Sequence, residues 1–212
     1  MAGLKKRGFD LPEALALFPL PGAVLLPRGR LPLHIFEPRY LHMVEDVLKT
    51  PHRLIGMIQP MGEGLSGIGT AGRIIGFSEE DDGRMMIQLR AVSRFRLVSA
   101  QEGFTPYLRG QVDWAGFARD EGPEETDPGF DRKSFVARLS RFMALRELST
   151  DWNALEEAAD EVLINALSQL LPLDPEEKQA LLQAPTLTDR RKVLDGLMEY
   201  ALLSSDGEET VQ

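Results

Sequence analysis

Two overlapping glycine motifs have a spacing that could support cofactor chemistry. Residues 62–67 and 67–72 each match G-x-G-x-x-G, the pattern with which a backbone turn holds a dinucleotide pyrophosphate at the start of a helix. The residues that follow, 73–77 (RIIGF), are typical of a strand, whereas the cofactor motif must open a helix. We therefore expect a flexible loop between strands here and no bound cofactor.

The titratable and nucleophilic side chains form no recognisable catalytic or metal-binding set. The chain has no cysteine and only three histidines, His34, His42 and His52, so few side chains could ligate a transition metal. The acids of residues 79–82 precede Gly83 and are typical of a solvated turn. No lysine follows a glycine, as a phosphate-binding loop requires, and no G-x-S-x-G segment presents a serine nucleophile. The sequence thus predicts no metal, no cofactor and no enzymatic activity.

Residues 17–40 (LFPLPGAVLLPRGRLPLHIFEPRY) contain side chains suited to binding a partner. The arginines and aromatic residues of this run could form an exposed surface for peptides or nucleic acid. The alternative is a charged loop beside buried aromatic residues. Glu37 and Arg39 flank Pro38, where we expect a local ion pair at the corner between a strand and a helix. The candidate partner-binding residues are Arg28, Arg30, Phe36, Glu37, Arg39 and Tyr40.

The prolines of the same run predict the elements that position these residues. Proline cannot donate a hydrogen bond to a sheet, so the first four indicate starts, edges or turns of short strands that enter like a hairpin: Pro19, Pro21, Pro27 and Pro32. The fifth, Pro38, suits the first turn of a helix. The apolar stripe of that helix runs from Tyr40 to Leu48 and ends before Pro51.

Periodicity then divides the rest of the chain into strands followed by helices. Strands are expected at residues 53–59, 69–77, 84–92, 94–101 and 107–114, with a turn at Asp82-Gly83. Four helices are expected after residue 131: one near Phe135, one over 155–171, one after the capping residues 174–177, and one capped by Thr188. We predict an α+β protein with a mostly antiparallel β subdomain at 1–115, an acidic exposed connection at 116–130, a four-helix subdomain at 131–204 and a frayed tail at 205–212.

Charge and hydropathy limit the class of partner. The net charge is −9, and residues 116–212 carry 21 acidic against 10 basic side chains, whereas residues 1–115 carry 12 against 14. The acidic half repels phosphate backbones, so nucleic-acid binding is disfavoured there but stays open for the first half. No run approaches the ~20 apolar residues that span a bilayer. We expect a cytoplasmic protein with no membrane partner.

The run at 17–40 resembles the opening of the Lon protease amino-terminal domain, and the resemblance continues along the chain. It includes RLIGMIQP at 53–60, TAGRIIGFSEEDDGRMMIQLRAVSRFRLV at 70–98 and LLPLDPEEKQALLQAP at 170–185. The resemblance extends from about Leu15 to Leu203. It implies a PUA-like β subdomain followed by a helical bundle. No ATPase or Ser-Lys peptidase segment is recognisable in these residues, which suggests a free-standing form of the domain.

The same resemblance implies a function in binding. In Lon proteins this module helps to recognise unfolded or tagged proteins, so we expect a non-enzymatic module that binds exposed polypeptide segments. It could act as an adaptor with a Lon-type ATPase or a chaperone in trans. PUA-like folds also bind RNA, and that alternative would use the arginines of the β subdomain: Arg28, Arg30, Arg84, Arg90, Arg94 and Arg96.

Overall fold

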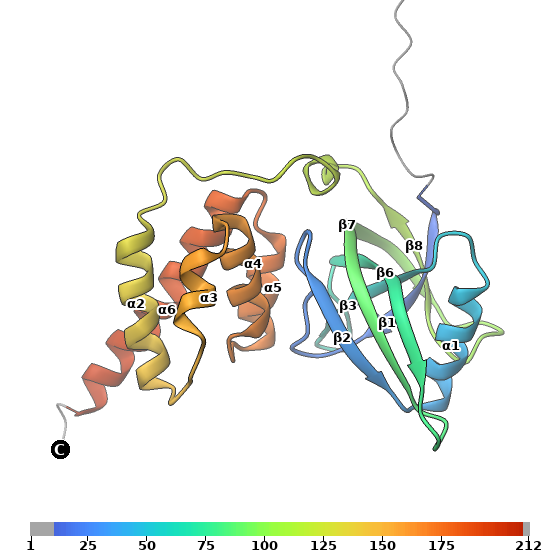
Figure 1. The fold of residues 1–212 in the computed structure, drawn as a ribbon. Coiled ribbons are helices and arrows are strands. Elements are labelled where there is room, and N and C mark those ends of the chain that lie inside the picture. Colours follow the sequence, from blue (N-terminus) through green and yellow to red (C-terminus); the bar gives the residue numbers. More distant parts are fainter. Residues whose placement is uncertain (1–10, 210–212) are drawn as a thin grey trace, which may run out of the picture.

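The computed structural model describes residues 11–209, in which the strands come first and all helices but one follow them (Figure 1). The strands are β1 (Ala14–Pro19), β2 (Arg30–Ile35), β3 (Leu54–Ile58), β4 (Pro60–Met61), β5 (Gly64–Leu65), β6 (Ile68–Glu79), β7 (Met85–Gln101) and β8 (Arg109–Asp113). The helices are α1 (Pro38–Leu48), the short 3-10 helix η1 (Ala118–Glu121), α2 (Arg132–Leu145), α3 (Trp152–Glu157), α4 (Asp160–Leu170), α5 (Pro175–Gln183) and α6 (Leu187–Glu209). This confirms the predicted α+β class.

The main sheet closes on itself because the long strand β7 pairs on both of its sides. The strand order is β2-β7-β6-β3-β1-β8, and β7 also pairs with β8. Neighbouring strands are antiparallel except for β1 and β3, which are parallel. The first part of β7 pairs with β2 and its last part with β8. We predicted two strands at 84–92 and 94–101. They form one strand with a bulge at Val92, where the register against β6 shifts and the strand bends.

The predicted hairpin between the first two strands is wrong. β1 pairs with β3 and β8, whereas β2 pairs with β7. The segment between them leaves the sheet because Val24 and Leu26 are buried against Leu182 of the helical part. The prediction that prolines lie at edges holds for Pro32. The Gly29 carbonyl accepts from Ala91 of β7, so by alternation the backbone of Pro32 faces the free edge of β2, where no donor is required.

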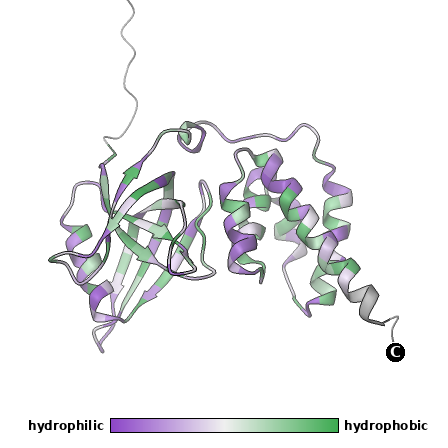
Figure 2. Cartoon of the chain, turned by 180° about the vertical axis from the view of Figure 1, so that it is seen from behind, coloured by the Kyte–Doolittle hydropathy of each residue, from purple (hydrophilic) through white to green (hydrophobic). Residues whose placement is uncertain are grey.

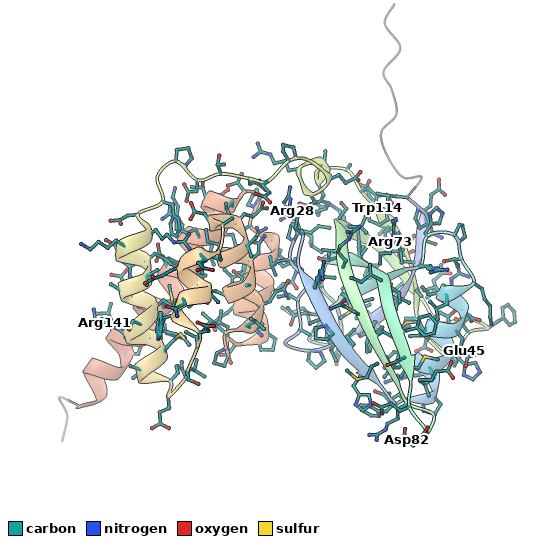
Figure 3. The ribbon with its side chains drawn as sticks, viewed as in Figure 1. Arg28, Glu45, Arg73, Asp82, Trp114 and Arg141 are labelled. Atoms are coloured by element: carbon teal, nitrogen blue, oxygen red, sulfur yellow. The ribbon has the colours of Figure 1, made fainter. Side chains whose placement is uncertain are left out.

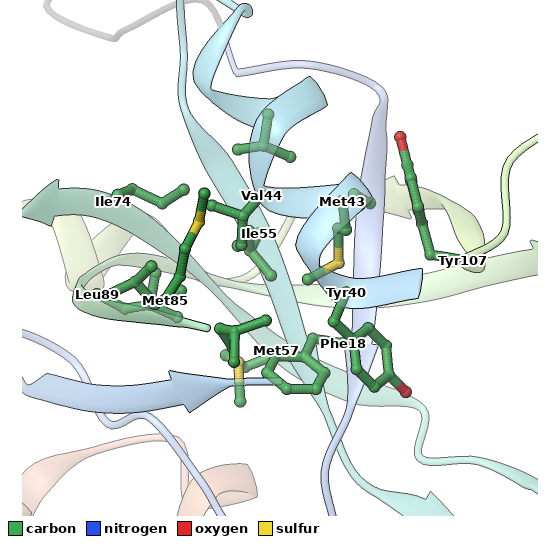
Figure 4. Packing of buried hydrophobic residues seen from close by; sticks show 14 of the residues in the cluster. Phe18, Tyr40, Met43, Val44, Ile55, Met57, Ile74, Met85, Leu89 and Tyr107 are labelled. Atoms are coloured by element: carbon green, nitrogen blue, oxygen red, sulfur yellow. The ribbon is translucent and has the colours of Figure 1, made fainter. Parts of the chain in front are cut away.

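Helix α1 covers one face of the barrel with the apolar stripe that the sequence predicts. Tyr40, Met43, Val44 and Val47 are buried and pack with sheet residues including Phe18, Ile55 and Leu89 (Figure 4). A second cluster, which contains Leu17 and Phe95, lies on the opposite face of β1 and β3. At roughly 1.5 to 3 kcal/mol for each fully buried large apolar side chain, these two clusters are the main stabilising contribution in this half.

The carboxy-terminal helices share one apolar core, and hydrophobic residues follow the inward sides of the helices (Figure 2). The helix predicted over 155–171 is two helices, because Ala158 and Ala159 have extended backbones. Arg132 stabilises this break by donating to the carbonyl oxygens of Leu155, Glu156 and Ala158 at 2.6 to 3.1 Å. The region therefore has five helices, α2 to α6, in place of the four expected.

The helix ends show which predicted caps form. The capping box of Asp174 and Glu177 is present at the start of α5, with Pro175 as the first helical residue. Thr186, not Thr188, caps α6, since its hydroxyl accepts from the Asp189 backbone N–H at 3.1 Å. The helix then continues through Glu209, where we expected a frayed tail. Polar residues alone do not end a helix, and no proline follows Pro185.

Residues 116–130 are more firmly anchored than the predicted exposed connection. Most of their side chains are exposed, but Phe117, Asp120 and Asp127 are buried. Asp127 accepts from Nε of Arg191 on α6 at 2.8 Å. The low apolar content of this segment therefore did not reveal how it is held, because two of its three buried side chains are carboxylates.

No helix in residues 11–209 is long and apolar enough to cross a bilayer. The basic residues before residue 11 lie outside the described range.

Arg94 and Asp120 form a buried ion pair where the barrel meets the helices. The Asp120 carboxylate accepts from Nη2 of Arg94 at 2.9 Å and from the Arg94 backbone N–H at 2.8 Å. Arg94 also donates to the carbonyl oxygens of Leu182 and Ala184, at 3.0 and 2.7 Å. Strand β7, η1 and the α5–α6 connection therefore meet at one guanidinium group, whose residue is 1% exposed.

The first prediction tests this pair by Asp120→Asn. The substitution keeps the shape but leaves the Arg94 charge buried without a counter-charge, which costs about 3 to 5 kcal/mol of unfolding free energy. Urea denaturation followed by the fluorescence of Trp114 and Trp152 measures the loss. Asp82→Asn is the control, because the pair of Asp82 with Arg84 is exposed and its loss should leave the midpoint near that of the wild type. Equal midpoints for the two variants would contradict the prediction.

The second prediction concerns the glycines of the loop that resembles a cofactor motif. A Cβ at Gly69 would lie 2.5 Å from the Met57 carbonyl oxygen and 2.6 Å from the Phe95 ring, whereas a Cβ at Gly67 meets open space. Gly69→Ala should therefore cost about 1 to 3 kcal/mol through overpacking. Gly67→Ala should leave the thermal midpoint unchanged or slightly raised. If both variants unfold at the wild-type temperature, the role assigned to Gly69 is wrong.

Candidate functional site

The six predicted binding residues do not converge on one surface. Arg28 is held at the junction with the helical part, where it pairs with the nearly buried Glu161 and donates to the carbonyl oxygens of Gly122 and Pro123 at 3.0 and 2.6 Å. Burial raises the pKa of Glu161, and Arg28 opposes that shift. The Arg28 guanidinium is thus committed to internal partners and offers little to a ligand.

Tyr40 is part of the core, and its two neighbours form the expected ion pair. The Tyr40 ring lies 4.3 Å from the Phe18 ring, and burial raises its pKa. Nη2 of Arg39 lies 2.8 Å from the Glu37 carboxylate, which confirms the predicted pair at the start of α1. Both side chains are about half exposed, so the pair contributes little to stability.

Arg30 belongs to an exposed sheet surface that we call the ribbon face, formed by the outward residues of β2, β7 and β6. Exposure alternates along β2 and β7: Leu89 and Ile87 point into the core, whereas their neighbours point to solvent. A Cβ at Gly76 would meet nothing within 4 Å, so the surface is open at its centre. The ribbon face consists of Arg30, Pro32, His34, Met86, Gln88, Arg90, Arg73, Gly76 and Ser78.

One end of the ribbon face is apolar. Met86 lies directly opposite His34, and the His34 ring lies 6.3 Å from the Phe36 ring in an edge-on arrangement. Phe36 is 63% exposed and Met86 38% exposed. His34 is oriented by Glu80, whose carboxylate lies 3.1 Å from Nε2. Phe36 therefore belongs to a small exposed cluster with His34 and Met86.

The opposite end of the ribbon face is basic. Arg30 lies opposite Arg90 across β2 and β7, and Arg90 lies opposite Arg73 across β7 and β6. Figure 3 shows Arg73 at this end of the ribbon, whereas Asp82 marks the hairpin tip at the other. The sequence showed these arginines individually. Their alignment into one row depends on strand register, which the sequence does not reveal.

Two cavities flank Tyr107 on the other side of α1. One, of about 490 Å³, lies between α1 and the ends of β1 and β8 and includes His52 and Arg109 in its lining. The other, of about 350 Å³, includes Arg39 and Tyr40. Burial raises the pKa of Tyr107 to about 12, and its hydroxyl donates to Asp46 at 2.9 Å. Sequence reasoning missed this region, because its residues come from four separate segments.

The other candidate chemistry can now be placed. The glycine segment follows β4 and leads through β5 into strand β6, so no helix begins at its end, as predicted. In the described part of the chain no three His, Asp or Glu side chains are grouped as metal ligands. Arg94 is buried, Arg84 pairs with Asp82 and Arg28 pairs with Glu161, so three of the six arginines considered for RNA are already engaged.

Comparison with known proteins gives one consistent family. The model of the ATP-dependent protease La (LON) substrate-binding domain matches residues 14–199. Lon protease 2 of Myxococcus xanthus is 25% identical over 197 residues, and Lon protease 2 of Syntrophobacter fumaroxidans is 29% identical over 193 residues. These alignments cover 87% and 86% of this chain, but only 23% of either relative. The chain thus spans about a quarter of the length of these proteases.

Solved structures share the fold over nearly the same range. The Lon N-terminal domain protein from Xanthomonas campestris is 25% identical with a TM-score of 0.60, and the alignment covers 88% of this chain and 98% of that one. The N-terminal domain of the Mycobacterium avium complex Lon protease has a TM-score of 0.64 at 14% identity, with the same coverage. The match of residues 14–199 and this shared fold show that the chain belongs to the Lon substrate-binding domain family.

Proposed function

We propose that this chain binds exposed polypeptide segments of other proteins, and that the ribbon face with Phe36 is the surface that receives them. The family is described as a substrate-binding domain, and the substrates of a protease are polypeptides. The observation that carries the proposal is the exposure of Phe36 beside Met86 on an open sheet face. Covering large apolar side chains of this kind is favourable by roughly 1.5 to 3 kcal/mol for each one fully buried.

The edge of the sheet indicates how such a segment would bind. The free edge of β2 carries Pro32, which has no N–H, and the outward carbonyl of Arg30 already accepts from Gln169 at 3.2 Å. Addition of a substrate strand to this edge would therefore lack two of its hydrogen bonds. Contacts of side chains across the ribbon face are the better mode, and they require no single substrate sequence.

We further propose that the chain acts as an adaptor in protein quality control. A Lon-type protease or a chaperone acting in trans in the cytoplasm would then unfold or degrade the bound protein. In this proposal the described residues supply the recognition surface. The RNA alternative is weaker, because Arg94 is buried and Arg28 is held by Glu161.

The third prediction tests the apolar end. Phe36→Ser should weaken binding of an unfolded model protein about tenfold, since a central exposed aromatic anchor commonly contributes more than 1 kcal/mol to an interface. Fluorescence anisotropy with a labelled, permanently unfolded protein measures it. Phe104→Ser is the matched control, because Phe104 is fully exposed in the loop beside the Tyr107 cavities. Loss of binding only in Phe104→Ser would move the site to those cavities and overturn the assignment.

The fourth prediction separates client binding from the adaptor role. In-cell crosslinking followed by identification of captured proteins should enrich unfolded clients and subunits of a protease or chaperone. Phe36→Ser should lose the clients and retain the subunits, because docking of a machine need not use the substrate surface. If neither variant nor wild type captures any protease or chaperone subunit, the adaptor role is rejected while client binding is judged on its own.

A further inference from the structure

The arginine row at the basic end of the ribbon face places like charges in opposite positions of neighbouring strands. Arg30, Arg90 and Arg73 lie directly opposite one another on three adjacent strands. Side chains in such positions have Cβ atoms about 4.5 to 5.5 Å apart, and like charges there destabilise a sheet. The adjacent exposed guanidinium groups of Arg30 and Arg90 therefore favour occupation by an anion, which would relieve their repulsion.

The row is accessible. Arg30 and Arg90 are exposed, and neither forms an ion pair with a carboxylate among residues 11–209. The neighbouring row toward the hairpin tip contains no charge, since it consists of Pro32, Gln88 and Gly76. A guanidinium group suits a carboxylate, because its planar N–H donors bind both oxygens at once.

The two ends of the ribbon face lie close enough for one extended peptide to contact both. Arg30 and His34 are four residues apart on one strand, which corresponds to about 13 Å at 3.3 Å per residue. An extended peptide lying along the face has nearly the same rise per residue. If an apolar residue of the peptide packs against Phe36 and Met86, the peptide side chain about four positions away therefore lies over the arginines.

We propose that the arginine row selects polypeptide segments that carry acidic residues about four positions from an apolar anchor. This inference rests on the proposed function and adds a substrate class to it. The row binds the carboxylates, and the cluster of Phe36, His34 and Met86 binds the anchor.

A nucleic acid fits this face less well than a polypeptide. A strand of phosphates along the ribbon would pass from the arginines to the hairpin end, where Glu79 and Glu80 lie. Those carboxylates repel a polyanion, and the chain as a whole carries a net charge of −9. A peptide with its charge confined to one end avoids that repulsion.

The test compares two labelled peptides that share an aromatic anchor. One carries a pair of aspartates centred four residues from the anchor, and the other carries asparagines at those positions. At low salt the wild-type chain should bind the aspartate peptide about tenfold more tightly, and this preference should fall at high salt, where charges are screened. The double variant Arg30→Gln/Arg90→Gln should bind both peptides as the wild type binds the asparagine peptide.

Arg141→Gln is the matched control, since Arg141 is an exposed arginine on α2, far from the ribbon (Figure 3). It should keep the tenfold preference. Equal binding of both peptides by the wild type overturns the acidic selection but leaves the proposed function standing. Binding of neither peptide, nor of the unfolded protein, overturns both. Displacement of the aspartate peptide by an RNA oligonucleotide at lower concentration than by unlabelled peptide overturns the polypeptide assignment. The salt response of the wild type keeps the test decisive if the double variant fails to fold.

Discussion

The buried guanidinium of Arg94 is the constraint on which the arrangement of the two halves depends. A charge in the interior is tolerated only when paired and fully hydrogen-bonded, so every segment that satisfies it must stay in place. Here those segments are strand β7 itself, Asp120 of η1, and the carbonyl oxygens of Leu182 and Ala184 at the carboxy-terminal end of α5. A shift of the helices relative to the barrel would leave the charge without partners, and its cost would rise steeply.

A second buried arginine extends the same logic into the helical part. Arg190 donates to the Leu181 carbonyl oxygen at 3.0 Å and to the Asn165 side chain at 2.9 Å. Burial and the nearby Arg94 lower its pKa to about 10, so the group stays charged at neutral pH. Asn165 in turn donates to the Pro27 carbonyl oxygen at 3.0 Å. The junction thus combines a small apolar cluster with a directional polar network, which fixes an orientation that hydrophobic burial alone would leave loose.

The sequence predicted the elements whose signals are local and missed those that depend on register. The stripe of α1 and the capping box of α5 are local patterns, and both are present in the structure. Arg90 and Arg94 are four residues apart, a spacing at which two residues of one regular strand would share a face. The bulge at Val92 places them on opposite faces, so one is exposed and the other buried. No propensity distinguishes these two arginines, and for the same reason the row across β2, β7 and β6 could not be foreseen.

The rigid junction and the open ribbon face are complementary requirements of substrate recognition. A surface that receives many sequences gains little from a deep, shaped pocket, because each new side chain would have to fit it. A sheet surface loses little backbone entropy on binding when its strands are already fixed on both sides, as β7 is by β2 and β6. The polar network at Arg94 ties the middle of the same strand to the helices. Strand β7 therefore carries both features, and the bulge at Val92 lies between the part that binds and the part that anchors.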